Sequence, residues 1–260
     1  MKIQSVQRAI DILSLFSKSR PTYSLTEIAN ALGLKISTVH GIVSTLEQNG
    51  FLRTDLRTRQ YRLGSKLLEL GGYFGSSLEI NLHAASLAQG LAQRVNLNVR
   101  VGIWDANSVL ITLFAFPQGT ANSAYNFGSR LSPYCTAIGR AILAFIEKEV
   151  CISYLEREQF VKHTKYTLTT MEAILADLDE IRERGYAINR GESSLSRAGI
   201  AAPIWGPGKR LEGGLAIPGR TDEILGENMS ALADDLLDTA SEISESMGFM
   251  VGEQGGNMRR

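Results

Sequence analysis

Cysteine and histidine are scarce in this sequence, with two cysteines and three histidines among 260 residues. Cys135 and Cys151 are too few and too far apart for a disulfide framework or a metal-binding knuckle, so we expect both to be simple buried thiols. His40, His83 and His163 are scattered and do not show the spacing of metal ligands. The sequence therefore predicts neither a metal nor a cofactor.

Long apolar runs are also missing, and no run approaches the length that crosses a bilayer. The start, from Met1 to Ser5, leads into an amphipathic helical pattern rather than a signal sequence. We expect a cytoplasmic protein that does not engage a membrane.

An overall excess of one charge sign is absent, because 27 basic residues balance 27 acidic ones. The balance hides an asymmetry: residues 1–62 hold nine basic and four acidic groups, so the rest of the chain is net acidic. Such an asymmetry is typical of a chain whose first part meets phosphate and whose second part does not.

Two short helical patterns follow each other between residues 24 and 48. Ser24 and Glu27 have the spacing of a capping box, and Gly33 suits the left-handed conformation that ends a helix. Ser37 is placed to cap the second helix. The buried stripe of that helix is expected to consist of Val39, Ile42, Val43 and Leu46.

The outward stripe of the second helix is polar and nearly uncharged. Small hydrogen-bonding groups can reach base edges in a major groove, and the one acid of the helix, Glu47, lies near its far end. Lys35, in the preceding turn, is placed to meet backbone phosphate. The residues expected to face DNA are Lys35, Ser37, Thr38, His40, Gly41 and Ser44.

An arginine-rich hairpin comes next. Alternating residues at 51–53 and 60–63 bracket a polar tip at 55–59, which predicts a two-stranded wing. The wing residues expected to contact DNA are Arg53, Arg57, Arg59 and Arg62. Capping box, turn, polar stripe and basic wing together predict a winged helix-turn-helix that binds double-stranded DNA, the alternative being a structural helix pair with a solvated hairpin.

Apolar patterns flank this segment on both sides. A leading helix is expected to pack across the helix pair through Ile3, Val6, Ile10, Leu13 and Phe16. Residues 65–82 predict a linking helix interrupted by Gly71, Gly72 and Gly75. Either its apolar residues pack against another subunit, or the double glycine marks a hinge.

The remainder alternates helices and strands without a βαβ repeat. Two antiparallel hairpins are predicted from strand patterns at 99–104, 109–116, 200–205 and 211–218. Helices are predicted at 82–94, 136–147 and 171–184, with a short strand at 186–189. Asp222 is placed to cap a long final helix. Antiparallel hairpins covered by helices indicate an α+β domain of the sensor type.

Several stretches together resemble the IclR-type bacterial transcriptional regulators over nearly the whole chain. They are SVQRAIDIL at 5–13, LTEIA at 25–29, STVH at 37–40, LEQNGFL at 46–52, YRLG at 61–64, CTAIGRA at 135–141, IRERGYA at 181–187 and AAPI at 201–204. The resemblance implies a winged helix-turn-helix domain, a GAF-like effector domain with an antiparallel sheet flanked by helices, and homodimers or homotetramers on a palindromic operator. It also implies control by a small organic acid or an aromatic catabolite.

The effector site that the resemblance implies lies where Thr136 begins a helix, beside Cys135. Unpaired amides at a helix N-terminus attract a carboxylate, which makes the backbone amides of Ala137 and Ile138 the candidates. Relatives that bind small oxoacids carry an acidic residue, a cysteine and two serines at the positions matching Asn189, Gly199, Ala216 and Pro218. These departures remove hydrogen-bonding groups, so we expect a larger or more aromatic acid.

Alternatives remain for three of these positions and for the function. Arg100, on a predicted strand, either faces solvent or supplies a cation to the acid. Asn189 and Gly199 either line the site or only accommodate backbone turns. Cys135 and His163 could in principle serve an enzyme, but no nucleophile elbow, HExxH or phosphate loop is present. An interaction protein with weak DNA binding is the third class.

These patterns divide the chain into four parts. Residues 1–63 are the expected winged helix-turn-helix domain, 64–82 a linker helix, 83–251 an effector-binding and oligomerisation domain, and 252–260 a disordered tail. We expect a DNA-binding regulator, a repressor or an activator, rather than an enzyme.

Overall fold

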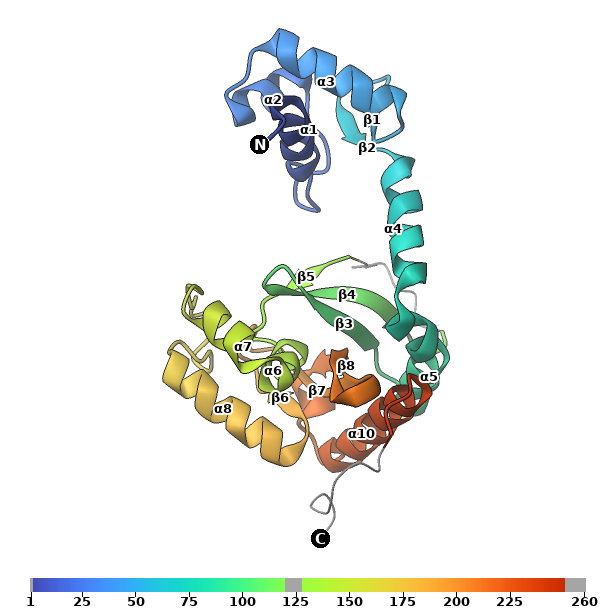
Figure 1. The fold of residues 1–260 in the computed structure, drawn as a ribbon, viewed down its shortest axis with the longest axis vertical. Coiled ribbons are helices and arrows are strands. Elements are labelled where there is room, and N and C mark those ends of the chain that lie inside the picture. Colours follow the sequence, from blue (N-terminus) through green and yellow to red (C-terminus); the bar gives the residue numbers. More distant parts are fainter. Residues whose placement is uncertain (1, 120–127, 251–260) are drawn as a thin grey trace. The chain divides into compact units, whose positions relative to one another are not determined.

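The structure is a computed structural model that describes residues 2–119 and 128–250. The tail expected at 252–260 lies outside the described residues. The chain divides into two compact units, Met1–Ser77 and Leu78–Arg260. The first holds a helix-turn-helix with a two-stranded hairpin and the second an antiparallel sheet with helices on both faces, which confirms the predicted fold class (Figure 1).

The first unit contains four helices and two short strands in its described part. In chain order they are α1 (Gln4–Ser14), α2 (Leu25–Leu32), α3 (Ile36–Gln48), β1 (Leu52–Thr54), β2 (Tyr61–Leu63) and α4 (Ser65–Ser77). β1 and β2 pair antiparallel as the expected wing. A small core joins the helices to the wing and is formed by Ile12, Phe16, Tyr23, Ile28, Ala29, Val39, Val43 and Leu52.

The predicted capping of α2 is confirmed, whereas that of α3 is wrong. Ser24 Oγ accepts from the Glu27 amide, the Glu27 carboxylate accepts from the Ser24 amide, and Gly33 ends α2 at φ 64°. The N-cap of α3 is Lys35 rather than Ser37, and no side chain caps this end. Because α3 already begins at Ile36, two residues earlier than a cap at Ser37 predicts, Ser37 lies in the first turn of the helix.

The buried face of α1 also differs from the prediction. Ile3, Val6 and Ile10 are 63%, 54% and 51% exposed, and Ile12, which was not predicted, is fully buried. Of the other predicted residues, Phe16 is buried and Leu13 half-buried. The helix carries two apolar stripes roughly a third of a turn apart, and periodicity alone does not say which one meets the core. The stripe of Ile3, Val6 and Ile10 is left on the surface.

The linking segment is broken at a different residue from the predicted one. α4 runs without interruption through Gly71, Gly72 and Gly75, none of which adopts a positive φ. The break occurs at Leu78, whose extended backbone separates α4 from α5 (Glu79–Val95). Glycine lowers helix propensity but does not forbid helical dihedrals, so the glycines weaken this helix without ending it.

A six-stranded antiparallel sheet forms the centre of the second unit. Its spatial order is β5-β4-β3-β8-β7-β6. The strands are β3 (Val99–Asp105), β4 (Ser108–Ala115), β5 (Arg130–Leu131), β6 (Ala187–Asn189), β7 (Arg197–Trp205) and β8 (Leu211–Arg220). Both predicted hairpins, β3–β4 and β7–β8, are confirmed.

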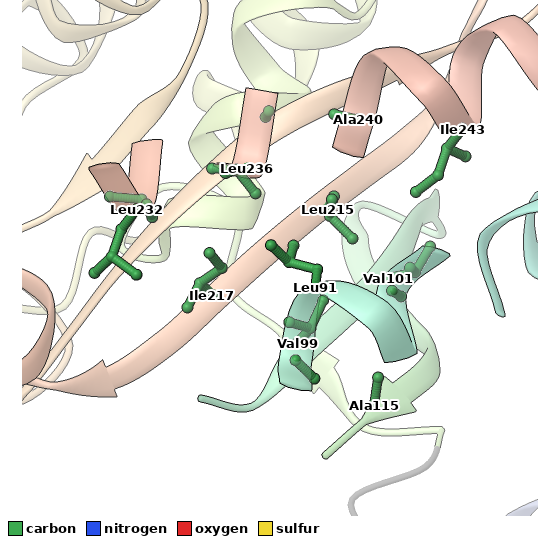
Figure 2. Packing of buried hydrophobic residues seen from close by; sticks show 14 of the residues in the cluster. Leu91, Val99, Val101, Ala115, Leu215, Ile217, Leu232, Leu236, Ala240 and Ile243 are labelled. Atoms are coloured by element: carbon green, nitrogen blue, oxygen red, sulfur yellow. The ribbon is translucent and has the colours of Figure 1, made fainter. Parts of the chain in front are cut away.

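Helices cover both faces of this sheet. α5 and α10 (Met229–Ser246) bury the face that carries Val99, Val101, Leu215 and Ile217 (Figure 2). α6 (Ala137–Phe145) buries the other face, against Ala201 and Ala216, and α8 (Met171–Arg184) packs against α6. Because neighbouring residues of a strand point to opposite faces, this division decides which side chains can meet at α6.

Two features of the second unit differ from the sequence prediction. α7 (Lys148–Leu155) was not predicted, although Cys151, Tyr154 and Leu155 bury at helical spacing. Asp222 does not cap the final helix: it lies in the short helix α9 (Thr221–Ile224), where its carboxylate pairs with Arg220. A further turn separates α9 from α10, which starts at Met229. Asp222 therefore marks the start of α9 and not the start of the final helix.

Candidate functional site

The outward stripe of α3 is open to solvent as its polarity predicts. Val39 and Val43 are buried against the first unit's core, while Ser37, His40, Gly41 and Thr45 are exposed and Thr38 and Ser44 half-buried. Lys35 is exposed at the start of the helix. The residues expected to face DNA therefore share one surface.

Glu47, the only acid in α3, is bound to the wing. The Glu47 carboxylate accepts hydrogen bonds from the amide of Thr54, at 3.0 Å, and from the Thr54 hydroxyl. This interaction joins the end of α3 to β1 and gives the Glu47 carboxylate two hydrogen-bond donors. The sequence did not indicate this pairing, because the two residues lie in different elements.

The wing presents its arginines around an ordered tip. Arg53 and Arg62 are directly opposite each other in the β1–β2 ladder, and Arg57 and Arg59 are exposed at the tip. The Asp55 carboxylate accepts from the amides of Arg57 and Thr58, and the hydrogen bond from Arg57 lowers the pKa of Asp55. The four guanidinium groups make no ion pair within the described residues, so they are available to an external anion.

The N-terminus of α6 offers two backbone amides to a ligand. Thr136 Oγ1 accepts from the Gly139 amide at 3.2 Å, which caps the third residue of the helix. Among the described residues, the amides of Ala137 and Ile138 have no hydrogen-bond partner, and both residues are buried. Because an unpaired amide in a buried position costs free energy, this end of the helix is suited to an anion.

Gly139 explains why α6 begins at this place. A Cβ at residue 139 would lie 2.3 Å from the carbonyl oxygen of Pro133, closer than any real contact. Only glycine lets the chain before the helix pack against its first turn. Cys135 and Thr136 are thereby held beside the helix N-terminus.

Asn189 and Gly199 lie under this helix end, and neither only accommodates a turn. Asn189 ends β6, is 4% exposed, and donates from Nδ2 to the carbonyl oxygen of Cys135 at 2.6 Å. Gly199 is its ladder partner in β7, and a Cβ there would contact the Cβ of Ala137 at 3.7 Å. Gly199 therefore lies within a strand rather than in a turn, whereas Asn189 ends β6 and also holds the following turn, because its Oδ1 accepts from the Gly191 amide.

The remaining predicted positions extend this surface along the sheet. Pro218 pairs with Gly199, and Ala216 pairs with Arg100 of β3. Arg100 is half-buried on the α6 face, with its guanidinium carbon 5.4 Å from the ring centre of Phe114. Arg100 thus faces inward rather than into solvent, and Phe114 adds an aromatic surface that the sequence pattern did not indicate.

Arg197 is a second residue that the sequence pattern did not indicate. It begins β7 two residues before Gly199, so both residues belong to the same face of the sheet. Burial lowers the pKa of Arg100, and the positive charge of Arg197 lowers it further. The sequence predicts this strand only from residue 200. Extending the alternation of inward and outward residues back to residue 197 would have placed Arg197 on the face that α6 covers.

A buried ion network joins α6 to α8 and to the loop that follows β6. The fully buried Arg140 of α6 donates to Asp177 of α8 at 2.9 Å, and to Glu192 and the carbonyl oxygen of Ile188 at 2.7 Å each. Glu192 in turn accepts from the Arg190 amide. The network therefore holds the loop between β6 and β7, whose two ends carry Asn189 and Arg197.

A surface hollow of about 1040 Å³ lies further along β7 and β8, between Arg197 and α9. It is open to solvent, and the charges of Arg220 and Asp222 on its wall are already paired. We place the candidate ligand site at the start of α6, where Asn189, Gly199 and Cys135 come together, and not in this hollow.

Residues 2–119 and 128–250 hold no cluster of three or more histidine, cysteine, aspartate or glutamate side chains that could bind a metal ion. No helix in those two ranges has the length and apolar character needed to cross a membrane.

Comparison with known protein families matches both units. Residues 5–56 match the IclR helix-turn-helix domain, and residues 74–245 match the domain described as bacterial transcriptional regulator IclR C-terminal. Together the two matches span most of the chain, in the order in which the two units occur.

Curated relatives are similar over almost their full length. The chain is 28% identical over 247 residues to the HTH-type transcriptional regulator XynR of Escherichia coli, covering 95% of this chain and 98% of the relative. It is 30% identical to the DNA-binding transcriptional repressor YiaJ of the same organism, covering 93% and 86%.

Solved structures show the same fold. One from Alicyclobacillus acidocaldarius, an IclR transcriptional regulator, has a TM-score of 0.81 at 26% identity, covering 94% of this chain and 99% of that one. An IclR homologue from Microbacterium hydrocarbonoxydans, complexed with 4-hydroxybenzoate, has a TM-score of 0.81 at 21% identity, covering 94% and 99%.

Proposed function

The chain belongs to the IclR family of bacterial transcriptional regulators, and from this premise we propose how its two units divide the work. The first unit holds a DNA operator with α3 in the major groove and the arginine wing on the phosphate backbone. The second binds an organic acid at the start of α6 and thereby changes the affinity for DNA. Whether the outcome is repression or activation depends on where the operator lies relative to the promoter.

The observation that carries the DNA proposal is the pairing of Glu47 with Thr54. It engages the carboxylate of the one acid of α3 and joins the wing to the helix, so a polar stripe and four arginines without an ion pair in the described residues are held on one unit. Preorganised groups of this kind supply both positioning contacts and base contacts.

We propose that the protein binds DNA as a dimer or a tetramer on a palindromic operator. The α1 stripe of Ile3, Val6 and Ile10 is more than half exposed, and α4 exposes Leu68, Tyr73 and Phe74. Apolar surface of this extent on a small unit supports self-association, because burying it against a second copy removes it from water. Two copies would also place two recognition helices on two half-sites.

The effector proposal rests on the buried amides of Ala137 and Ile138. A carboxylate supplies the acceptor that the described residues do not provide. Ala216, Pro218 and the ring of Phe114 form an apolar surface beside it, which favours an aromatic or longer acid over a small oxoacid. That an IclR homologue has been crystallised with 4-hydroxybenzoate supports this class of ligand.

The DNA proposal is tested by selecting duplexes from a random-sequence pool and measuring affinity for the selected duplex by fluorescence anisotropy across a salt series. The logarithm of affinity should fall steeply with the logarithm of salt concentration. Arg57→Ala and Arg59→Ala should each weaken all duplexes alike and reduce the slope by about 1. Thr38→Ala and His40→Ala should change which sequences are selected.

The matched control is Arg157→Ala, which removes an exposed arginine from the second unit. Its salt dependence should equal that of the unmodified protein. A weak affinity that hardly responds to salt would contradict the regulator proposal and favour an interaction protein. If Thr38→Ala and His40→Ala lower affinity without changing sequence preference, α3 has been assigned the wrong face.

The effector proposal is tested by thermal-shift measurements with 4-hydroxybenzoate, benzoate, hexanoate and glyoxylate. The aromatic and longer acids should raise the melting temperature and change affinity for the selected duplex. Stabilisation by glyoxylate alone would show that the apolar character of the site has been misjudged.

We further propose that the protein is cytoplasmic and not an enzyme. Burial raises the pKa of the Cys135 thiol, which opposes the thiolate that a catalytic cysteine needs. His163, the other residue considered for catalysis, lies on the surface outside the α6 site, and its backbone amide donates to the hydroxyl of Thr167.

A further inference from the structure

Two arginines share the sheet face on which α6 begins. Arg100 is opposite Ala216, which is opposite Ala201, while Arg197 is two residues along β7 from Gly199. Strand geometry puts Arg197 about 7 Å from Gly199 and Arg100 about 10 Å from Ala201, across two strand spacings. Both side chains are long enough to meet between these positions.

Neither guanidinium has a carboxylate partner in the part of the chain that the structure describes. Arg100 Nε is buried without a hydrogen bond, and no ion pair involves Arg197. The acids nearest in the ladder are engaged elsewhere: Asp222 pairs with Arg220, and Glu223 accepts from the Arg220 amide. The internal stretch at 120–127 contains no acidic residue in its sequence.

This arrangement is unfavourable for the protein alone. Taking Arg100 out of water and placing Arg197 beside it both disfavour the charged form of Arg100, as the lowered pKa of Arg100 reflects. Two like charges on one face, without a carboxylate partner in the described residues, are typical of a binding site. An anionic group between them would remove the repulsion and supply charge-assisted hydrogen bonds.

We propose that the effector is a diacid, with one carboxylate on the amides of Ala137 and Ile138 and a second between Arg100 and Arg197. This inference rests on the effector site proposed above and narrows its ligand class. Both subsites lie on the face of the sheet that α6 covers, a few ladder positions apart. A benzene ring with para carboxylates is a rigid probe of two such subsites and a six-carbon aliphatic diacid is a flexible one, and the Phe114 ring beside Arg100 offers either probe an apolar contact.

The test compares matched pairs of acids by isothermal titration calorimetry on the full chain: terephthalate with benzoate, and adipate with hexanoate. Each diacid should bind at least about tenfold more tightly than its monoacid, the effect of one good charged hydrogen bond. Arg197→Gln should remove this advantage and leave monoacid affinity within about twofold, and Arg100→Gln should also remove the advantage. Arg157→Gln, an exposed control, should change neither.

The outcomes separate this inference from the proposed function. If monoacids bind as tightly as diacids, or if Arg197→Gln leaves diacid affinity unchanged, the second subsite is wrong and the α6 site stands. If none of the four acids binds, both this inference and the organic-acid effector fall.

A ligand-free measurement provides an independent check. Because Arg197 is exposed and adds only repulsion to Arg100, Arg197→Gln should have a melting temperature no lower than that of the unmodified protein. A clear decrease would show that Arg197 has a structural partner, and the diacid inference would then lose its basis.

Discussion

Asn189 donates a hydrogen bond of 2.6 Å to the carbonyl oxygen of Cys135, across 54 residues of sequence. Its Oδ1 accepts from the Gly191 amide at 3.1 Å. One buried amide group thus joins the end of β6, the following loop and the residue before the α6 cap. The position of the candidate effector site relative to the sheet depends on this contact.

Replacing Asn189 by alanine should therefore destabilise the second unit. The substitution leaves a buried carbonyl and a buried amide without partners, so we expect a loss of about 1–3 kcal/mol in the free energy of unfolding, measured by urea titration. Gln93→Ala, on the exposed face of α5, is the control and should change stability by less than about 0.5 kcal/mol. Equal effects of the two substitutions would show that the Asn189 contact contributes nothing.

The buried pair of Arg140 and Glu192 should be strongly coupled. Arg140→Met leaves the Glu192 carboxylate uncompensated in the interior and should cost about 3–5 kcal/mol. Adding Glu192→Gln should recover part of this loss, because it removes the stranded charge. A double-mutant cycle in urea measures the coupling, and strictly additive losses would contradict it.

Gly33 and Gly41 offer a matched test of backbone conformation in the first unit. A Cβ would meet nothing within 4 Å at either residue, but Gly33 has φ 64° and Gly41 lies within α3. Gly41→Ala should stabilise the chain by up to about 1 kcal/mol. Gly33→Ala should destabilise it by about 1–2 kcal/mol, because alanine is strained in the left-handed conformation.

Urea unfolding of the two glycine variants measures both effects, and DNA affinity separates stability from function. If Gly41→Ala is more stable but binds the selected duplex more weakly, the DNA backbone approaches α3 closely at this residue. A destabilised Gly41→Ala would instead mean that α3 is distorted at this point.

Both cysteines should react slowly with alkylating agents in the folded protein. Burial raises the pKa of Cys135 and of Cys151, so the neutral thiol is favoured in the native state. The unfolded chain releases these thiol protons at a lower pH than the native chain does. The two neutral thiols therefore contribute their full stabilisation of the native state below the ordinary thiol pKa of about 8.5, and this contribution is lost as the pH rises from there through the raised native pKa. Mass spectrometry after iodoacetamide treatment measures the rate.

Cys135→Ser supplies the functional readout for the same residue. It should retain DNA binding and the thermal shift caused by organic acids, since the backbone carbonyl rather than the thiol meets Asn189. Rapid alkylation of Cys135 in the native protein at neutral pH would contradict its assignment as a buried, unreactive thiol and would favour a nucleophilic role.

Local signals in the sequence were sufficient for much of the fold. The capping box at Ser24, the left-handed Gly33, the helix over 171–184 and both hairpins are confirmed because each depends on a few neighbouring residues. The N-caps assigned to Ser37 and Asp222 are wrong for a related reason. Serine and aspartate favour many turns, and local preference alone does not decide which turn starts a helix.

The candidate effector site was predicted in part. The start of α6 and the positions of Asn189 and Gly199 followed from the family resemblance, and the structure brings them together. Arg197 and Phe114 were missed because their relevance depends on sheet register. A strand that begins three residues earlier than predicted adds another side chain to the same face.

What the sequence determined by itself is therefore the set of elements and their order: a helix-turn-helix with an arginine wing, followed by an α+β unit whose helix begins at a threonine cap. Tertiary structure alone decided which faces are used. It buried Ile12 of α1 and left Val6 and Ile10 exposed, and it placed Arg100 and Arg197 on one face of the sheet and Asn189 beside Cys135. The physical reason is range: caps and turns act over three or four residues, whereas burial and sheet pairing join residues tens of positions apart.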